Sequence, residues 1–237
     1  DVAVVDNVTT GAGHGGGGIY NSGGDVMLIG CLVSNNEAAV SGGGIASVNA
    51  TLSLADCVVD SNKAADSSGG GIYLSSGGVL TLTNSAVNGN EADGDGGGIY
   101  SSGTDASAVL TNCTISDNKA TAVDSEGGGI YNSGQGTIVA LTNCTVSGNE
   151  ATKRGGGIYS SGDSASVTLT DSTVSGNALT DATSDGGGIY IDQGQATLTQ
   201  CTVSGNEAQD WGGGIHIQSG NAYLNHCTVS DNDAGNQ

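Results

Sequence analysis

The chain has 237 residues, of which 44 are glycine and none is proline or phenylalanine, and its 24 acidic residues face only 4 basic ones. The formal charge of −20 argues against nucleic acid and anionic lipid as partners, because both are bound through basic patches. No apolar run approaches the roughly 18 residues that cross a bilayer, so we expect no membrane span in this chain.

One sequence motif recurs from end to end with a period of about 28 residues. Its clearest copy, Leu-Thr-Asn-Cys-Thr-Val-Ser-Gly-Asn, surrounds Cys144, and we use the position of this cysteine as the anchor of each repeat. A regular period of this length is typical of a solenoid, in which each repeat packs only against its neighbours. The anchors are Ala3, Cys31, Cys57, Ser85, Cys113, Cys144, Ser172, Cys201 and Cys227.

In chain order, the first expected strand is the anchor segment at residues 1–7, and a Gly-Gly-Gly-Ile block that ends at Ile19 begins the second. A third strand leads to the next anchor, and this order recurs up to the last anchor strand, which begins at Cys227. Apolar and polar residues alternate in these segments as in strands, and no segment has the 3.6-residue apolar period of a helix.

Short strands on a fixed period can bury their apolar faces only by stacking. The preferred handedness of parallel crossovers then predicts a right-handed parallel β-helix. We expect one domain over residues 1–237, with about eight coils of three short strands and no evident caps. At about 4.8 Å per coil, such a rod is roughly 38 Å long.

Two polar positions recur five and six residues after the anchor. From Cys31 onward asparagine always occupies the first, and we expect its amides to stack along the coil axis at a tight corner. The second alternates in charge over five coils, which places opposite charges side by side. Both columns indicate a structural role. The asparagines are Asn36, Asn62, Asn90, Asn118, Asn149, Asn177, Asn206 and Asn232, and the charged residues are Glu37, Lys63, Glu91, Lys119 and Glu150.

The Gly-Gly-Gly-Ile-Tyr blocks and the Cys-Thr-Val-Ser-Gly-Asn segments resemble the right-handed β-helix repeats of microbial surface proteins, most of all those of the polymorphic outer-membrane proteins. Repeats of that family pair a glycine block with a Phe-x-x-Asn block, and Val146 with Asn149, like Val203 with Asn206, stands at the Phe and Asn positions. The pectin-lyase-like superfamily shares this architecture. The resemblance covers nearly the whole chain and implies a β-helix at the cell surface.

The sequence offers few residues suited to catalysis. An enzyme that cleaves acidic sugars stabilises developing negative charge with basic groups, whereas the overall charge of this chain repels such substrates. The histidines belong to repeats at opposite ends of the rod and cannot form one site. We therefore expect no enzymatic activity. The basic residues are Lys63, Lys119, Lys153 and Arg154, and the histidines are His14, His216 and His226.

Acidic residues gather just before several glycine blocks, and stacked loops could supply the six to eight oxygen ligands that calcium prefers. Their spacing differs between coils, however, and favours a solvated acidic face that keeps the rod soluble. Calcium stays an alternative, and no other cofactor is expected. The acidic residues are Asp93, Asp95, Asp124, Glu126, Asp181 and Asp185.

All six cysteines occupy the anchor column, as three pairs in neighbouring coils. Neighbouring parallel strands lie about 4.8 Å apart, which brings the Cα atoms of each pair within reach of a disulfide. Buried thiols that act as small hydrophobic groups would fit the column equally well, so both alternatives stay open. The pairs are Cys31 with Cys57, Cys113 with Cys144, and Cys201 with Cys227.

A tyrosine follows most glycine blocks, and we expect it to point outward. This tyrosine stripe would either dock a sugar or protein partner or shield the glycine-rich backbone. Four Asn-x-Thr sequons are candidate glycosylation sites for an extracellular chain. The tyrosines are Tyr20, Tyr73, Tyr100, Tyr131, Tyr159 and Tyr190, and the sequons begin at Asn7, Asn49, Asn112 and Asn143.

Three functions fit these features, and we expect an extracellular location. The first is a structural protein of the cell surface whose rods join end to end or side by side into a fibre, sheath or surface layer, so that its partner is a second copy of itself. The second is an adhesin or autotransporter-like passenger that binds host or cell partners. The third is an ice-binding β-helix with an outward threonine row, although Leu32, Val58 and Ala86 interrupt this row in the early coils. The row consists of Thr114, Thr145, Thr173, Thr202 and Thr228.

Overall fold

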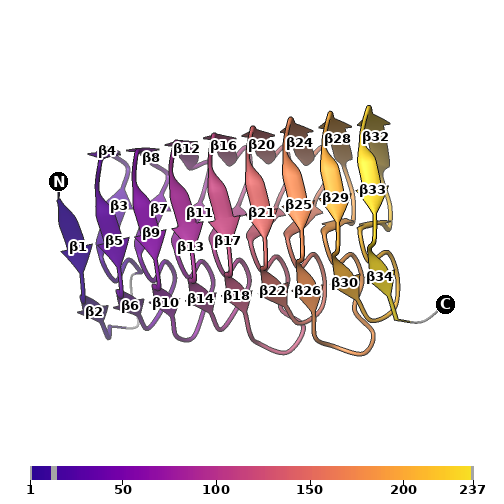
Figure 1. Ribbon diagram of the computed structural model, residues 1–237. Coiled ribbons are helices and arrows are strands. Elements are labelled where there is room, and N and C mark those ends of the chain that lie inside the picture. The colour runs from indigo at the N-terminus through magenta and orange to yellow at the C-terminus, as the bar shows by residue number, and fades with distance from the viewer. Residues whose placement is uncertain (1, 12–14, 236–237) are drawn as a thin grey trace.

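The computed structural model describes residues 2–11 and 15–235. These residues form 34 strands and no helix, and the strands wind into coils that stack along one axis as a rod (Figure 1). Strands of successive coils pair in parallel and make two sheets of nine strands and two of eight. The right-handed parallel β-helix expected from the sequence is confirmed. Within the described ranges there is no helix long and apolar enough to cross a membrane.

Two sheets contain the longer strands, and we name them the tyrosine sheet and the broad sheet. The tyrosine sheet consists of β3 (Ile19–Ser22), β7 (Ile45–Val48), β11 (Ile72–Ser75), β15 (Ile99–Ser102), β19 (Ile130–Ser133), β23 (Ile158–Ser161), β27 (Ile189–Ile191) and β31 (Ile215–Ile217). The broad sheet consists of β4 (Asp25–Ile29), β8 (Thr51–Ala55), β12 (Val79–Thr83), β16 (Ser107–Thr111), β20 (Ile138–Thr142), β24 (Ser166–Thr170), β28 (Gln195–Thr199) and β32 (Asn221–Asn225).

The other two sheets have strands of three and of two residues, and we name them the anchor sheet and the short sheet. The anchor sheet consists of β1 (Ala3–Val5), β5 (Leu32–Ser34), β9 (Val58–Asp60), β13 (Ala86–Asn88), β17 (Thr114–Ser116), β21 (Thr145–Ser147), β25 (Thr173–Ser175), β29 (Thr202–Ser204) and β33 (Thr228–Ser230). The short sheet consists of β2 (Val8–Thr9), β6 (Glu37–Ala38), β10 (Lys63–Ala64), β14 (Glu91–Ala92), β18 (Lys119–Ala120), β22 (Glu150–Ala151), β26 (Ala178–Leu179), β30 (Glu207–Ala208) and β34 (Asp233–Ala234).

Each coil therefore has four strands, and the expected number of three is wrong. The additional strand is the two-residue member of the short sheet, which follows the stacked asparagine. Its one inward side chain is usually a small alanine, such as Ala92 or Ala120. A single small apolar residue gives too little alternation to mark a strand in the sequence.

The register of the first repeat also differs from the expected one. β1 pairs with β5 through Ala3 and Leu32, so the anchor position of this coil falls one residue before Ala3. Val4 packs against the core, whereas Val5 is 37% exposed. Two adjacent valines leave the alternation ambiguous in the sequence, and the pairing with the next coil decides which of them points inward.

Residues with positive φ make the corners between the broad, anchor and short sheets. Asn84 (φ 49°) and Asn112 (φ 55°) turn the chain from the broad sheet into the anchor sheet, and Asp117 (φ 57°) turns it into the short sheet. Asparagine and aspartate tolerate this left-handed conformation better than most residues. The recurrent polar residues beside the anchor are therefore corner residues.

A single hydrophobic core runs along the rod. In one coil, the tyrosine sheet contributes Ile72, the broad sheet contributes Leu80 and Leu82, and the anchor sheet contributes Val87, all fully buried. Burial of each such side chain is worth about 1.5–3 kcal/mol. Because every coil repeats this set, the core has the same cross-section along most of the axis.

The stacked asparagines form an inner amide ladder at the corner between the anchor and short sheets. The Nδ2 of Asn90 donates to Asn118 Oδ1 over 2.9 Å and to the carbonyl of Val59 over 3.0 Å, and the backbone N–H of Asn90 donates to the same Asn118 oxygen over 3.0 Å. This pattern recurs from coil to coil. The ladder is confirmed, and it begins one coil earlier than expected, since Asn7 Nδ2 donates to Asn36 Oδ1 over 2.8 Å.

Candidate functional site

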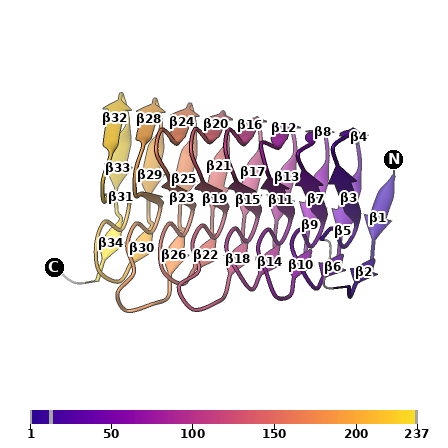
Figure 2. The same cartoon turned by 180° about the vertical axis from the view of Figure 1, so that it is seen from behind.

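The tyrosine stripe lies on the tyrosine sheet, and Figure 2 labels the strands β3, β7, β11, β15, β19, β23 and β31 of this sheet. The rings of neighbouring coils stack face to face, and those of Tyr73 and Tyr100 have centroids 5.0 Å apart and planes within 2°. The described stack ends at His216, whose ring lies 5.0 Å from that of Tyr190 at 8°. This histidine is therefore the last ring of the same column.

The tyrosine stripe is not exposed along its whole length. Tyr20 is 43% exposed, whereas Tyr159 and Tyr190 are only 6% and 2% exposed. The guanidinium of Arg154 lies over the Tyr190 ring, 5.4 Å from its centroid. Burial also raises the pKa of the Tyr100 hydroxyl. Tyr159 and Tyr190 are thus covered, which fits the shielding alternative at these two positions, and the docking stripe stays a prediction.

Ala46 interrupts the described tyrosine column. It pairs directly with Tyr20 in the preceding coil and with Tyr73 in the following coil. Strand pairing keeps the coils at their usual spacing, so the missing ring leaves a pocket of about 180 Å³ between these two tyrosines. The side chain of Val48 lines the same pocket.

The loops that precede the glycine blocks carry a compact group of charges. Arg154 forms backbone bridges with Glu126 on one side and Asp185 on the other, in successive coils. Its Nη1 donates to Glu126 Oε1 over 2.8 Å, and Lys153 Nζ lies 3.3 Å from Asp181 Oδ1. Burial raises the pKa of the Glu126 carboxyl, while Arg154 beside it acts in the opposite direction. The chain's own cations thus occupy this acidic loop region.

These contacts bear directly on the calcium hypothesis. Glu126 and Asp181 pair with basic side chains, as Asp93 does with Lys63 over 3.9 Å. Asp95 Oδ1 accepts the backbone N–H of Glu126 over 2.9 Å. Over residues 2–11 and 15–235, no three or more His, Cys, Asp or Glu side chains are grouped so as to hold a metal ion. Calcium binding stays a prediction.

The anchor column has a definite hydrogen-bonding role. The Cys57 thiol donates to the Ala55 carbonyl over 3.1 Å, and the Ser85 hydroxyl donates to the Thr83 carbonyl over 2.8 Å. Each also accepts the backbone N–H of the preceding anchor: Cys57 Sγ from Cys31 over 3.4 Å, and Ser85 Oγ from Cys57 over 3.0 Å. Cysteine and serine make the same two contacts, which explains why both occur in this column.

All six cysteines are free thiols in the structure, and all except Cys227 are buried. The thiols of Cys113 and Cys144 interact, and the hydrogen bond from Cys144 lowers the pKa of Cys113 to about 7 while the pKa of Cys144 rises. Burial raises the pKa of Cys57. The three predicted disulfides are not formed in the structure and stay a prediction for an oxidising environment.

The sequon asparagines occupy two different settings. Asn49, Asn112 and Asn143 lie at exposed corners with positive φ. Asn143 Nδ2 donates to Asn112 Oδ1 over 2.8 Å, and Asn112 Nδ2 donates to Asn84 Oδ1 over 3.0 Å. The sequence did not predict this outer amide ladder, although its members share the position before the anchor. Asn7 instead begins the inner amide ladder. Glycosylation of these residues stays a prediction.

The alternating charges pair between coils as predicted. Lys63 Nζ lies 2.6 Å from Glu91 Oε1, and Lys119 Nζ lies 3.6 Å from Glu150 Oε2. These side chains are roughly half exposed, so each pair contributes at most about 1 kcal/mol. The column is therefore a minor structural feature.

The histidines do not form a common site in the described residues. His216 lies in β31 of the tyrosine sheet, and its Nε2 is 3.3 Å from Gln218 Oε1. His226 is a corner residue with φ 55° just before β33. His14 lies outside the described residues. The two described histidines thus take separate structural positions in the last coil.

Comparisons with curated proteins and with solved structures found no match. One protein-family model, described as the right handed beta helix region, matches residues 56–235, which is more than half of the chain. This span begins at a corner between the broad and anchor sheets and runs to the end of the last described coil. The chain therefore belongs to the right-handed β-helix family.

Proposed function

We propose that the chain is an extracellular structural rod of the cell surface that associates with copies of itself into a fibre, sheath or surface layer. The observation that carries this proposal is the continuity of its ladders. Inner amides join neighbouring coils through hydrogen bonds of 2.8–2.9 Å, and stacked rings join them again on another side. The inner amide ladder joins every described coil, and the stacked rings add a second connection from Tyr73 to His216. A rod joined in this way resists bending, which suits a mechanical element.

The lack of an enzymatic role stays a prediction, because this fold hosts many functions. In support of a structural role, each basic residue of the chain has an acidic neighbour, so these residues do not combine into a cationic cleft for an acidic sugar. The pairs are Lys63 with Glu91, Lys119 with Glu150, Lys153 with Asp181, and Arg154 with Glu126.

Such a rod can associate end to end or side by side. We favour side-by-side association, because the broad sheet presents a long face with exposed apolar side chains such as Met27 and Ile138.

Ice binding is a second candidate, supported by one observation. The broad sheet carries a second outward column of threonines beside the predicted threonine row of the anchor sheet. In the two earliest coils, Ala55 and Ile29 take the place of threonine in this column. Two parallel threonine columns make a regular hydroxyl and methyl surface. A thermal hysteresis assay tests this candidate, and freezing at the equilibrium melting point would remove it. The second column consists of Thr83, Thr111, Thr142, Thr170 and Thr199.

The adhesin alternative is weakened by the burial of Tyr159 and Tyr190. Within the tyrosine stripe, the Tyr20 end has an exposed ring that such a partner could contact. Any such partner would approach a strongly acidic molecule and would need to be neutral or basic.

The proposal is tested by location and by assembly. Antibody labelling of intact source cells should match the labelling of permeabilised cells, and signal only after permeabilisation would contradict an extracellular location. Electron microscopy of the purified chain over a range of concentrations should show assemblies of aligned rods. Discrete single rods at every concentration would contradict self-association.

A further inference from the structure

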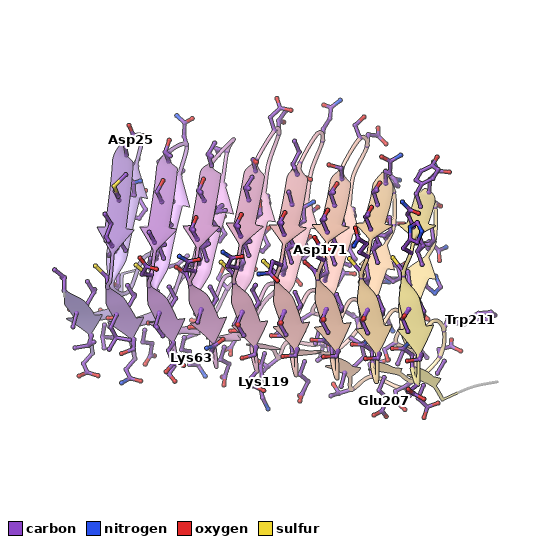
Figure 3. All side chains as sticks on the ribbon, turned by 45° about the horizontal axis from the view of Figure 1, so that its top comes forward. Asp25, Lys63, Lys119, Asp171, Glu207 and Trp211 are labelled. Carbon is purple, nitrogen blue, oxygen red and sulfur yellow. The ribbon has the colours of Figure 1, made fainter. Side chains whose placement is uncertain are left out.

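The outward face of the broad sheet carries almost no charge. In β12 the buried Leu80 and Leu82 alternate with the outward Val79, Thr81 and Thr83, and the other strands of the sheet follow the same alternation. Across all eight strands, Asp25 is the only charged residue. Figure 3 labels Asp25 at the upper border of this face, and Lys63, Lys119 and Glu207 along the opposite border of the rod. The strands of the tyrosine and anchor sheets are similarly poor in charge, with Asp60 as their one Asp, Glu, Lys or Arg. The exposed apolar side chains are what set the broad sheet apart.

The same face carries many of the exposed large apolar side chains. Met27 and Ile29 in β4 are 71% and 62% exposed, and they are the most exposed apolar side chains on this face. The remaining members continue along the face into later coils, and the polar positions between them are mostly threonine and serine. These remaining members are Val79, Val109, Ile138 and Tyr223.

We infer that the broad sheet is the surface on which a second copy of this chain docks, broad sheet against broad sheet. The inference deepens the proposed self-association and rests on it. Contact through the short sheet would bring together glutamates such as Glu91, Glu150 and Glu207 of two copies, and contact through the glycine-block loops would bring together further acids. The strands of the broad sheet bring only Asp25 into such a contact, and the aspartates Asp56, Asp105 and Asp171 lie at its borders. Two strongly acidic molecules therefore face fewer like charges there than at the short sheet or the loops.

The size of the face suits this role. Eight strands at about 4.8 Å and five residues at about 3.3 Å give a face of roughly 38 by 16 Å, or about 600 Å² on each copy. The total lies near the lower limit of specific protein interfaces. Two identical sheets packed face to face lie about 10 Å apart and interdigitate their outward side chains. The contact is then isologous, with each copy contributing the same residues.

The inference is tested by placing charge on this face. We would measure the dissociation constant of the full chain by sedimentation equilibrium and compare it with the double variant Val109→Asp, Ile138→Asp. Both residues point outward and are about 40% exposed, so the fold is expected to survive. The matched control, Thr145→Asp with Ser147→Asp, adds the same charge to outward positions of the anchor sheet.

The double variant on the broad sheet should weaken association at least tenfold, and the control should change it less than threefold. Added salt should strengthen association of the unaltered chain, since it screens repulsion between the acidic rods. Circular dichroism and the urea midpoint verify that each variant folds, and Thr168→Asp on the same face serves as a second variant.

The remaining outcomes distinguish a failure of the docking face from a failure of the proposed self-association. Undiminished association of both broad-sheet variants would overturn the docking face and leave the proposed self-association standing. A monomeric wild type at all concentrations would overturn both. A monomer whose thermal hysteresis is lost in the broad-sheet variants would show that this face binds ice, which also overturns the inference.

Discussion

At the scale of single residues, the molecule has two amide ladders in opposite environments. Asn118 belongs to the inner amide ladder and is fully buried, whereas Asn112 belongs to the outer amide ladder at an exposed corner. Both use the same side chain and similar hydrogen bonds. The free energy of unfolding should nonetheless depend far more on the inner ladder, because a buried polar group without a partner cannot turn to water.

The variant Asn118→Ala should therefore lower the free energy of unfolding by about 3–5 kcal/mol. It removes the acceptor of two Asn90 donors and leaves the Val87 carbonyl without its amide donor. Urea denaturation measures the loss. The control Asn112→Gly removes an exposed amide while keeping the positive φ, and it should cost less than about 1 kcal/mol. Equal losses in the two variants would contradict the distinction.

Side-chain columns were predictable from the sequence, but contacts between loops were not. Asparagines such as Asn118 and charged residues such as Lys63 occupy fixed positions after the anchor of each repeat. In a solenoid, a fixed position in the repeat becomes a fixed place in every coil. Arg154 occurs once, in a loop of irregular length. Its contact with Glu126 and its place over Tyr190 depend on the path of that loop, which no periodicity describes.

At the scale of elements, the glycine blocks set how closely the coils approach. A Cβ added to Gly98 would lie 2.7 Å from the Gly129 carbonyl oxygen and 2.9 Å from the Asn118 amide carbon. Both are parts of the inter-coil stack and cannot move aside separately. The block is thus a contact surface between coils, and its adjoining strand carries the tyrosine column.

The variant Gly98→Ala should lower the free energy of unfolding by about 1–3 kcal/mol or more, through overpacking between coils. Thermal unfolding followed by circular dichroism measures the effect. Gly11→Ala is the matched control, because a Cβ there meets nothing within 4 Å, and it should change stability by less than about 0.5 kcal/mol. A Gly98→Ala variant with unchanged thermal stability would show that neighbouring coils can move apart to accept the methyl group without loss of free energy, which would contradict the prediction.

The anchor column places cysteine thiols of neighbouring coils next to each other, so oxidation should be able to join them. We expect a mild thiol oxidant to join Cys113 to Cys144, with both thiols losing a proton and an electron pair passing to the oxidant. Mass spectrometry after alkylation under denaturing conditions measures the bridge. Cys144→Ser keeps the hydrogen bonds of the column and removes the bridge. Full alkylation of Cys113 in the oxidised wild type would contradict this expectation.

The sequence predicted most elements because strand and corner patterns repeat with the coil. The two-residue short sheet was missed, since Ala92 alone marks its inward side. The register of β1 was placed one residue late because Val4 and Val5 are equally apolar. In both cases the backbone pairing of neighbouring coils, rather than local composition, decides the structure.

At the scale of the whole molecule, stability should rise on mild acidification. Burial raises the pKa of the Asp95 and Glu126 carboxyls, so each is harder to ionise in the folded rod than in the unfolded chain. The raised pKa values add to the free energy of unfolding below the ordinary carboxyl pKa of about 4. This contribution is lost as the pH rises through the raised pKa values of the folded rod. Relief of repulsion within a molecule of formal charge −20 acts in the same direction.

The urea midpoint should therefore be higher near pH ~4.5 than near pH ~7. Asp95→Asn should reduce this difference, since the amide has no charge to bury and still offers an oxygen to the Glu126 N–H. The control Asp163→Asn removes one exposed charge and should leave most of the difference. A midpoint that falls steadily on acidification would contradict the prediction.

The direction of the hydrogen bonds determines how the rod responds to force. Its strands run across the axis, and the bonds between coils run along it. A pull along the axis therefore loads these bonds in tension and opens them one after another, instead of shearing a whole sheet at once. Each coil that unwinds releases about 28 residues, which extend to roughly 95 Å at about 3.4 Å per residue. A tethered rod would therefore lengthen stepwise under load and rewind when the load falls.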